Sequence, residues 1–208
     1  PMAVRMIQML SMGHHLQRNI SEGQLFGLEN IYDHYLSEGA ADRMCAYLKE
    51  RWEKPGSRYH VMKEMFACLH KLEVLSADWP KKVRHYEKVL FGGGRKQYEA
   101  LHQYRMSDKI AEQLLSYFIY VYFAGAVYDG MPYSKVKLAV ISTMLIEDMV
   151  CAKAAEKGQL SFEAIADAAH SYAREVEHSD LNLQRLSTMF RHQKCFHIGR
   201  LCGALLEW

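Results

Sequence analysis

The chain has 208 residues, and half of them are hydrophobic, which is enough for one domain with a sizeable core. Its 26 basic and 24 acidic side chains give a formal net charge of +2, which argues against the strongly basic surface of a nucleic-acid binder. The five cysteines are scattered and form no CxxC pair, which excludes a local zinc ribbon or iron–sulfur ligand run and indicates a reducing cytoplasm.

Helix-favouring patterns dominate the sequence. It has only four prolines and no Asn-Gly or Asp-Gly hairpin signal, so we expect an all-α fold, a compact multi-helix array of about eight to nine helices. The first helix is expected over 3–12, with Ile7 and Leu10 facing inward and an end near Gly13. Ser21 is expected to cap the second helix, with Gln24 completing a capping box. The apolar stripe of that second helix would consist of Leu25, Leu28, Tyr32, Tyr35 and Leu36.

The later helices are expected over 40–53, 59–75, 80–90, 95–124, 134–157, 162–178, 182–191 and 195–206. Pro55-Gly56 would end the first of these, and the stretch over 95–124 would break near Ser107. Gly158 is suited to end the very apolar helix before it, and Ser161 is suited to cap the next one. We expect a single helical domain over 1–208, with the glycine-rich segment 91–95 as the candidate for a sub-division.

Two Glu-x-x-His pairs, Glu99 with His102 and Glu175 with His178, each place a carboxylate and an imidazole on one helix face. Each pair resembles half of a di-iron carboxylate site, which also needs a carboxylate from each of two further helices. Neighbouring residues predict mostly exposed positions for the helical candidates, Glu29, Glu64 and Glu147. A ferritin-like di-iron protein is therefore the less favoured alternative, and we predict no metal site.

Three other patterns do not amount to a site. The glycine run at 92–94, followed by Arg95-Lys96, lacks the strand and the spacing of a phosphate-binding loop, so a flexible turn is favoured. The pattern Cys195-x-His197 with Cys202 matches no closed zinc site, so packing thiols are favoured. The aromatic block over 117–123 either lines a groove for a peptide or an adenine ring or packs in the core, and core packing is favoured.

The densest polar pattern is Tyr-Ala-Arg-Glu-Val-Glu-His-Ser over 172–179, followed by Asn182-Leu183. Arg174 and His178 stand four residues apart and face the same way, so Arg174 would hold Glu177 or His178 in a fixed network. The alternative is a solvated helix end with His178 near the negative end of the helix dipole, and spacing alone favours this alternative.

This polar run resembles the C-terminal signature of the flagellin lysine-N-methylase family. Upstream, the segment Glu-Gln-Leu-Leu-Ser-Tyr-Phe over 112–118 resembles that family's Glu-Asn-Tyr-Leu segment, with Gln113 and Leu114 in place of its Asn and Tyr. The apolar helix over 135–149 matches in position and character, and the opening helices fit loosely. The resemblance spans most of the chain, and its specific part is 172–183.

The resemblance implies the C-terminal helical portion of an enzyme that methylates lysines of flagellin with S-adenosylmethionine. Members of the family carry a cysteine-rich N-terminal part, thought to hold an iron–sulfur cluster, and this chain lacks the corresponding CxxC pattern. The parent protein is thus expected to be an enzyme, and this portion alone to be inactive. The implied partners are flagellin and the cysteine-rich part. No membrane partner is expected, because no apolar run reaches the ~20 residues of a span.

The residues that match the family segments are the candidate site residues. Glu177 or His178 would take the proton of the substrate amine or orient that amine. Binding of substrate or donor would fall to Tyr172, Arg174, Glu175, Asn182, Glu112 and Tyr117. The alternative is a non-catalytic flagellin-binding or scaffold module that holds the helical flagellin in an apolar groove.

Overall fold

A computed structural model describes residues 1–51 and 58–207, and the regular structure within them is entirely helical. These residues form eleven α-helices of eight or more residues, one four-residue helix and three 3-10 turns. The all-α class is confirmed, with more helices than the expected eight to nine. In chain order the elements are α1 (Met2–Ser21), α2 (Leu28–Leu36), α3 (Ala40–Arg51), α4 (Arg58–Leu69), α5 (Trp79–Phe91), α6 (Gly94–Leu101), η1 (His102–Tyr104), α7 (Asp108–Tyr122), η2 (Phe123–Gly125), α8 (Ala126–Asp129), α9 (Pro132–Lys157), α10 (Phe162–Val176), α11 (Asp180–His192), η3 (Lys194–Phe196) and α12 (Ile198–Leu206).

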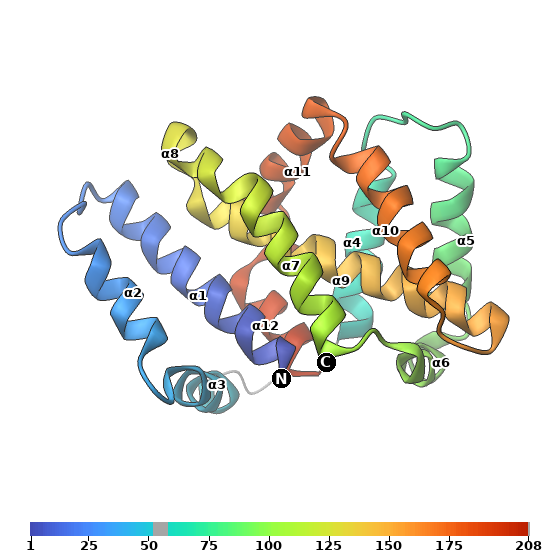
Figure 1. Ribbon diagram of the computed structural model, residues 1–208, viewed down its shortest axis with the longest axis horizontal. Helices are drawn as coiled ribbons and strands as arrows, with labels where there is room; N and C mark the ends of the chain where they lie inside the picture. The colour runs from blue at the N-terminus through green and yellow to red at the C-terminus, as the bar shows by residue number, and fades with distance from the viewer. Residues whose placement is uncertain (52–57, 208) are drawn as a thin grey trace.

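The helix α9 runs through the middle of the molecule, and α1, α5, α7, α10 and α11 pack around it (Figure 1). A helix that is buried on all sides has to be apolar all round, which explains the unusual composition of this segment. Its ends follow the sequence signals. Pro132 occupies the first turn, and Gly158 ends the helix in the left-handed conformation with a φ of 71°.

The first helix is longer than the sequence predicts, because Gly13 does not end it. The helix α1 continues to Ser21, and Gly13 lies where α1 packs against α9. A Cβ at position 13 would lie 3.0 Å from the Val136 side chain. Glycine here permits the close approach of two helices rather than a helix end. The expected inward residues Ile7 and Leu10 are both buried.

The expectation for the second helix is wrong. Ser21 ends α1 instead of capping α2, which begins at Leu28 after Gly27 in the left-handed conformation. The buried residue of α2 is Ile31. Three residues of the expected apolar stripe are exposed, namely Leu25, Tyr32 and Leu36. The expected end of the third helix at Pro55-Gly56 lies outside the described residues.

Most later boundaries agree with the prediction. Ser107 separates α7 from the preceding 3-10 turn, as expected. Ser161 caps α10, since its hydroxyl accepts a hydrogen bond from the Ala164 backbone N–H at 3.2 Å. The helix α4 ends at Leu69, earlier than predicted, because side chains from later helices bind the segment 73–76 in a non-helical form.

The segment Asp108–Asp129 is long and apolar enough to span a membrane by length and composition, contrary to the expectation that no apolar run reaches this length. In this structure η2 interrupts the segment, and α7 packs along α9. Only 17% of the most apolar part is buried. The segment therefore exposes an apolar face, on which Tyr120, Val127 and Tyr128 are 88%, 85% and 92% exposed.

Candidate functional site

A buried ionic cluster joins the first turn of α4 to the centre of α9. Glu147 and Asp148 are each 1% exposed, and Arg58 reaches both of them. Its Nη2 lies 3.0 Å from Asp148 Oδ1 and 3.2 Å from Glu147 Oε2. Burial of ionised groups costs several kcal/mol for each group unless they are paired. Such clusters are more frequent at functional sites than in ordinary cores, which makes this one the first candidate.

The cluster contains two carboxyl groups and one guanidinium ion at its centre. Asp148 also accepts a hydrogen bond from the Tyr98 hydroxyl at 2.8 Å, which makes it the better stabilised anion. Burial raises the pKa of Glu147 to about 8, against the opposing effect of Arg58. Burial also raises the pKa of Asp148, but the Tyr98 hydrogen bond acts against this, so Glu147 is the carboxyl group that more readily keeps its proton.

A polar pocket of about 410 Å³ opens beside this cluster. Small-molecule sites have volumes of roughly 300–1,000 Å³, so this pocket is large enough to hold a ligand. It is lined by Arg58, Tyr59, Arg95, Tyr98, Glu99, His102, Arg105 and Glu207. Because the lining combines cations, carboxylates and aromatic rings, it suits a ligand that carries charges of both signs.

His102 presents a hydrogen-bond donor that no group in the described part of the protein accepts. Its Nδ1 lies 3.2 Å from Nη2 of Arg105, and a guanidinium group only donates, so Nδ1 is the acceptor. The neutral ring then carries its hydrogen on Nε2, a buried atom without a partner among the described residues. Burial, reinforced by Arg58 and Arg105, lowers the pKa of His102 to about 3 and keeps the ring neutral. A buried unpaired N–H at a pocket wall indicates an acceptor that a ligand would supply.

Sequence patterns identify only part of this pocket. Glu99 and His102, the first Glu-x-x-His pair, both line it. The expectation that Glu147 is exposed is wrong, because Arg58 pairs with it from a distant part of the chain. In the described ranges, no group of three or more His, Cys, Asp or Glu residues is arranged to hold a metal ion. The sequence signal that could have identified the ionic cluster is the pair of adjacent acids Glu147-Asp148 in the most apolar helix, since buried charges are rarely unpaired.

The signature run over 172–182 folds around the loop that follows α4. Glu175 Oε2 accepts a hydrogen bond from the Leu75 N–H at 2.9 Å. The Asn182 side chain accepts from the Glu73 N–H at 2.6 Å and donates to the Glu73 carbonyl at 2.9 Å. Glu175 and Asn182 are both 0% exposed. These two side chains supply hydrogen-bond partners to backbone groups of the loop, which have no helical partners after the end of α4.

Arg174 has partners in the same loop region. Its guanidinium donates to the Ser76 hydroxyl at 2.9 Å and lies 3.5 Å from an Asp78 carboxylate oxygen. The expected network of Arg174 with Glu177 or His178 is therefore not the arrangement seen, because the loop before α5 provides a nearer acceptor.

Glu177 joins the two segments that carry the family resemblance. Its Oε2 accepts hydrogen bonds from the hydroxyls of Tyr117 and Tyr122 on α7, both at 2.9 Å. Nearby, Tyr172 packs edge-on against Phe118 of α7, with ring centroids 6.3 Å apart. Because α7 and α10 both pack on α9, these contacts bring segments that are distant in the sequence together.

The remaining candidates lie at the surface. Glu112 pairs with Arg5, and these side chains are 50% and 61% exposed. His178 is exposed. The aromatic block is divided between core and surface, since Phe118 is buried whereas Tyr120 is 88% exposed. The proton-transfer roles of Glu177 and His178 stay predictions.

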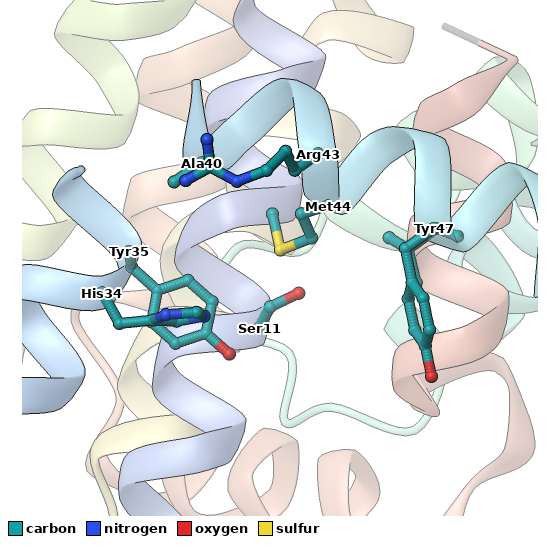
Figure 2. A pocket seen from close by; sticks show the side chains of 8 residues that line it. Ser11, His34, Tyr35, Ala40, Arg43, Met44 and Tyr47 are labelled. Atoms are coloured by element: carbon teal, nitrogen blue, oxygen red, sulfur yellow. The ribbon is translucent and has the colours of Figure 1, made fainter. Parts of the chain in front are cut away.

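A second hollow, of about 360 Å³, lies between α1, α2 and α3 (Figure 2). In this view Ser11 and Met44 lie between the rings of Tyr35 and Tyr47, and the Arg43 side chain extends above them. Most of its accessible lining is apolar. The N-terminal helices thus leave a groove that apolar side chains of a partner would fill.

One comparison with known proteins gives a match over almost the whole chain. The model of a family described as FliB lysine N-methylase C-terminal domain matches residues 1–204. No curated protein and no solved structure matches the chain. The match includes the ionic cluster, the run over 172–182 and every residue of the polar pocket except Glu207.

Proposed function

Because the chain belongs to the family of FliB lysine N-methylase C-terminal domains, we propose that it contributes methyl-donor binding to an enzyme that methylates flagellin lysines with S-adenosylmethionine. We assign the donor to the polar pocket beside the Arg58 cluster. The observation that carries this assignment is the buried Nε2–H of His102, which has no acceptor among the described residues.

The chemistry of the pocket lining fits the methionine end of the donor, which carries a carboxylate and an ammonium group on one carbon. His102 and Arg105 have N–H donors for the carboxylate. Glu99 and Glu207 have acceptors for the ammonium group. The ring of Tyr59 also lines the pocket, and the face of an aromatic ring attracts a cation such as a sulfonium.

The ionic cluster would keep one wall of the pocket in place. Asp148 and Glu147 hold the Arg58 guanidinium from behind, so this side chain needs no reorganisation when a ligand enters. A well-fixed wall matters because methyl transfer depends on precise alignment of the reacting atoms.

S-adenosylmethionine, when bound, supplies a methyl group to a neutral lysine amine. Neither Glu177 nor His178 lines the pocket. We therefore assign to the pocket only the holding and orientation of the donor.

Calorimetric titration with S-adenosylmethionine tests this function. The wild-type protein should bind the donor, and His102→Ala should weaken binding by roughly 10- to 100-fold, the usual effect of losing a hydrogen bond to a charged group. His85→Ala is the matched control, because His85 pairs with Glu156 on an exposed surface away from the pocket. Equal donor affinity of His102→Ala and wild type, or no donor binding by the wild type, would refute the assignment.

A specific observation also favours flagellin recognition as a second function. The groove of Figure 2 is an open apolar hollow between helices, the shape that receives the apolar face of an amphipathic helix. Large apolar side chains on the same helices are exposed, with Tyr32, Leu36 and Tyr47 at 58%, 53% and 52%. The two functions are compatible, because the groove and the donor pocket have no residue in common.

A further inference from the structure

Two cysteines that are distant in the sequence line the same pocket, at the end of α4 where this helix packs against η3. Cys68 belongs to the last turn of α4 and Cys195 to η3, and their side chains are 3% and 2% exposed. The Cys68 thiol donates a hydrogen bond at 2.9 Å to Oε1 of Gln193, two residues before Cys195. Disulfide formation requires two cysteines that are neighbours in the fold, and this placement favours it.

The two thiols differ in acidity. The neighbouring Cys195 thiol is the main cause that lowers the pKa of Cys68, with a smaller contribution from Lys71, and burial and Glu64 act against them. The neighbouring Cys68 thiol, together with burial, raises the pKa of Cys195. Because the thiolate is the reactive form of cysteine, Cys68 is the expected nucleophile and Cys195 the resolving thiol.

The pair has a route to solvent. Both thiols line an open pocket of about 450 Å³, whose other residues are Glu64, Ala67, Lys71, Gln193 and Lys194. Of these residues Lys71 favours a thiolate at Cys68, whereas Glu64 acts against it. The remaining cysteines are buried as well, and burial raises the pKa of Cys151 and takes the pKa of Cys202 to about 12.

We propose that Cys68 and Cys195 form a reversible redox pair that a hydroperoxide oxidises to a disulfide. The Cys68 thiolate attacks a peroxide oxygen and becomes a sulfenic acid, and the leaving hydroxide takes up a proton to form water. The Cys195 sulfur then attacks the sulfenic sulfur, which forms the S–S bond and releases a second water. In total the two thiols lose two hydrogens and two electrons, and hydrogen peroxide is reduced to two waters.

A small thiol such as dithiothreitol reverses the step by exchange. The disulfide would tie the end of α4 to the turn between α11 and α12. Neither cysteine lines the proposed donor pocket, so this pair does not depend on the proposed function.

Peptide mapping by mass spectrometry tests the proposal. The folded protein is treated with hydrogen peroxide, its remaining thiols are alkylated after unfolding, and the digest is searched for cross-linked peptides. Two of the five thiols should disappear, with a mass loss of about 2 Da, and the cross-link should join Cys68 to Cys195. Dithiothreitol should restore both thiols.

Variants separate the roles of the two thiols. Cys195→Ser should stop the reaction at a Cys68 sulfenic acid, which dimedone traps. Cys151→Ala is the matched control and should still form the disulfide. Five intact thiols after treatment, or a cross-link between other cysteines such as the neighbouring Cys45 and Cys202, would overturn the proposal. Peptide mapping of the wild-type protein shows whether the Cys68–Cys195 disulfide forms even where a variant fails to fold.

Discussion

Arg58 and Asp148 form an ion pair inside the protein, with 3.0 Å between the guanidinium Nη2 and the carboxylate Oδ1 and with side chains only 2% and 1% exposed. An intact buried pair adds little net stability, because the cost of desolvation offsets the attraction. Its presence is better explained by the need to hold Arg58 in a fixed position at the wall of the polar pocket.

Removing one partner of this pair should lower the free energy of unfolding by far more than the intact pair contributes to it. Arg58→Met leaves a buried carboxylate without its cation, so we expect the free energy of unfolding to fall by about 3–5 kcal/mol in urea denaturation. Arg200→Met is the control, because Arg200 pairs with Glu64 at the surface and its loss should cost at most about 1 kcal/mol. Equal losses in the two variants would contradict the structural role of the cluster.

The protonated state of Glu147 should appear as a pH dependence of stability. Burial raises its pKa to about 8 in the folded protein, well above the value of an unfolded chain. Between pH ~4.5 and ~8 the folded state holds a proton that the unfolded state has lost. The contribution of Glu147 to the free energy of unfolding therefore falls as pH rises through this range, by at most about 1.4 kcal/mol per pH unit.

Glu147→Gln removes this titration and keeps the shape of the side chain. His102 acts in the opposite direction below pH ~6.5, because its folded pKa is lowered to about 3, so the informative quantity is the difference between variant and wild type. In urea unfolding at several pH values, the free energy of unfolding of Glu147→Gln should rise relative to that of the wild type as pH rises. Glu112→Gln, at an exposed pair, should follow the wild type. A constant difference for Glu147→Gln would mean that Glu147 does not hold the proton.

Local sequence signals predict helix ends well where the conformation or the hydrogen bond of a single residue determines them. Gly158 and Ser161 act at helix ends through their own conformation and hydrogen bonds, and both expectations are confirmed. Gly13 shows the limit of this reasoning, because its role depends on Val136, a residue of another helix. A pattern along one helix cannot show which other helix comes close to it.

The candidate site depends even more on distant partners. The neighbours of Glu147 in the sequence do not show that Arg58 will reach it, and Arg58 itself stands in a segment without any motif. The run over 172–182 was identified by resemblance, yet the partners of Glu175 and Asn182 lie in the loop after α4. Spacing within a motif could therefore predict that these residues matter but not what they contact.

The position of Glu177 leads to a prediction about catalysis. Two tyrosine hydroxyls already hold its carboxylate, which favours a role in orienting Tyr117 and Tyr122 over proton transfer. We expect Glu177→Gln to lower flagellin methylation by the intact enzyme by less than tenfold and His178→Ala, at an exposed position, to change it by less than twofold. A general base would contribute roughly 100- to 10,000-fold, so a loss of that size in either variant would establish the catalytic role.

The apolar groove of Figure 2 leads to the last prediction, which concerns flagellin binding. Met44 lies in the middle of this groove, so Met44→Arg would place a charge where apolar side chains of flagellin are expected to pack. We expect its dissociation constant for monomeric flagellin, measured by calorimetry, to rise at least tenfold. Tyr120→Arg makes the same change on the exposed face of α7 and should leave the affinity within about twofold. The reverse result would place flagellin on α7, because only the surface in contact with a partner responds strongly to a buried charge.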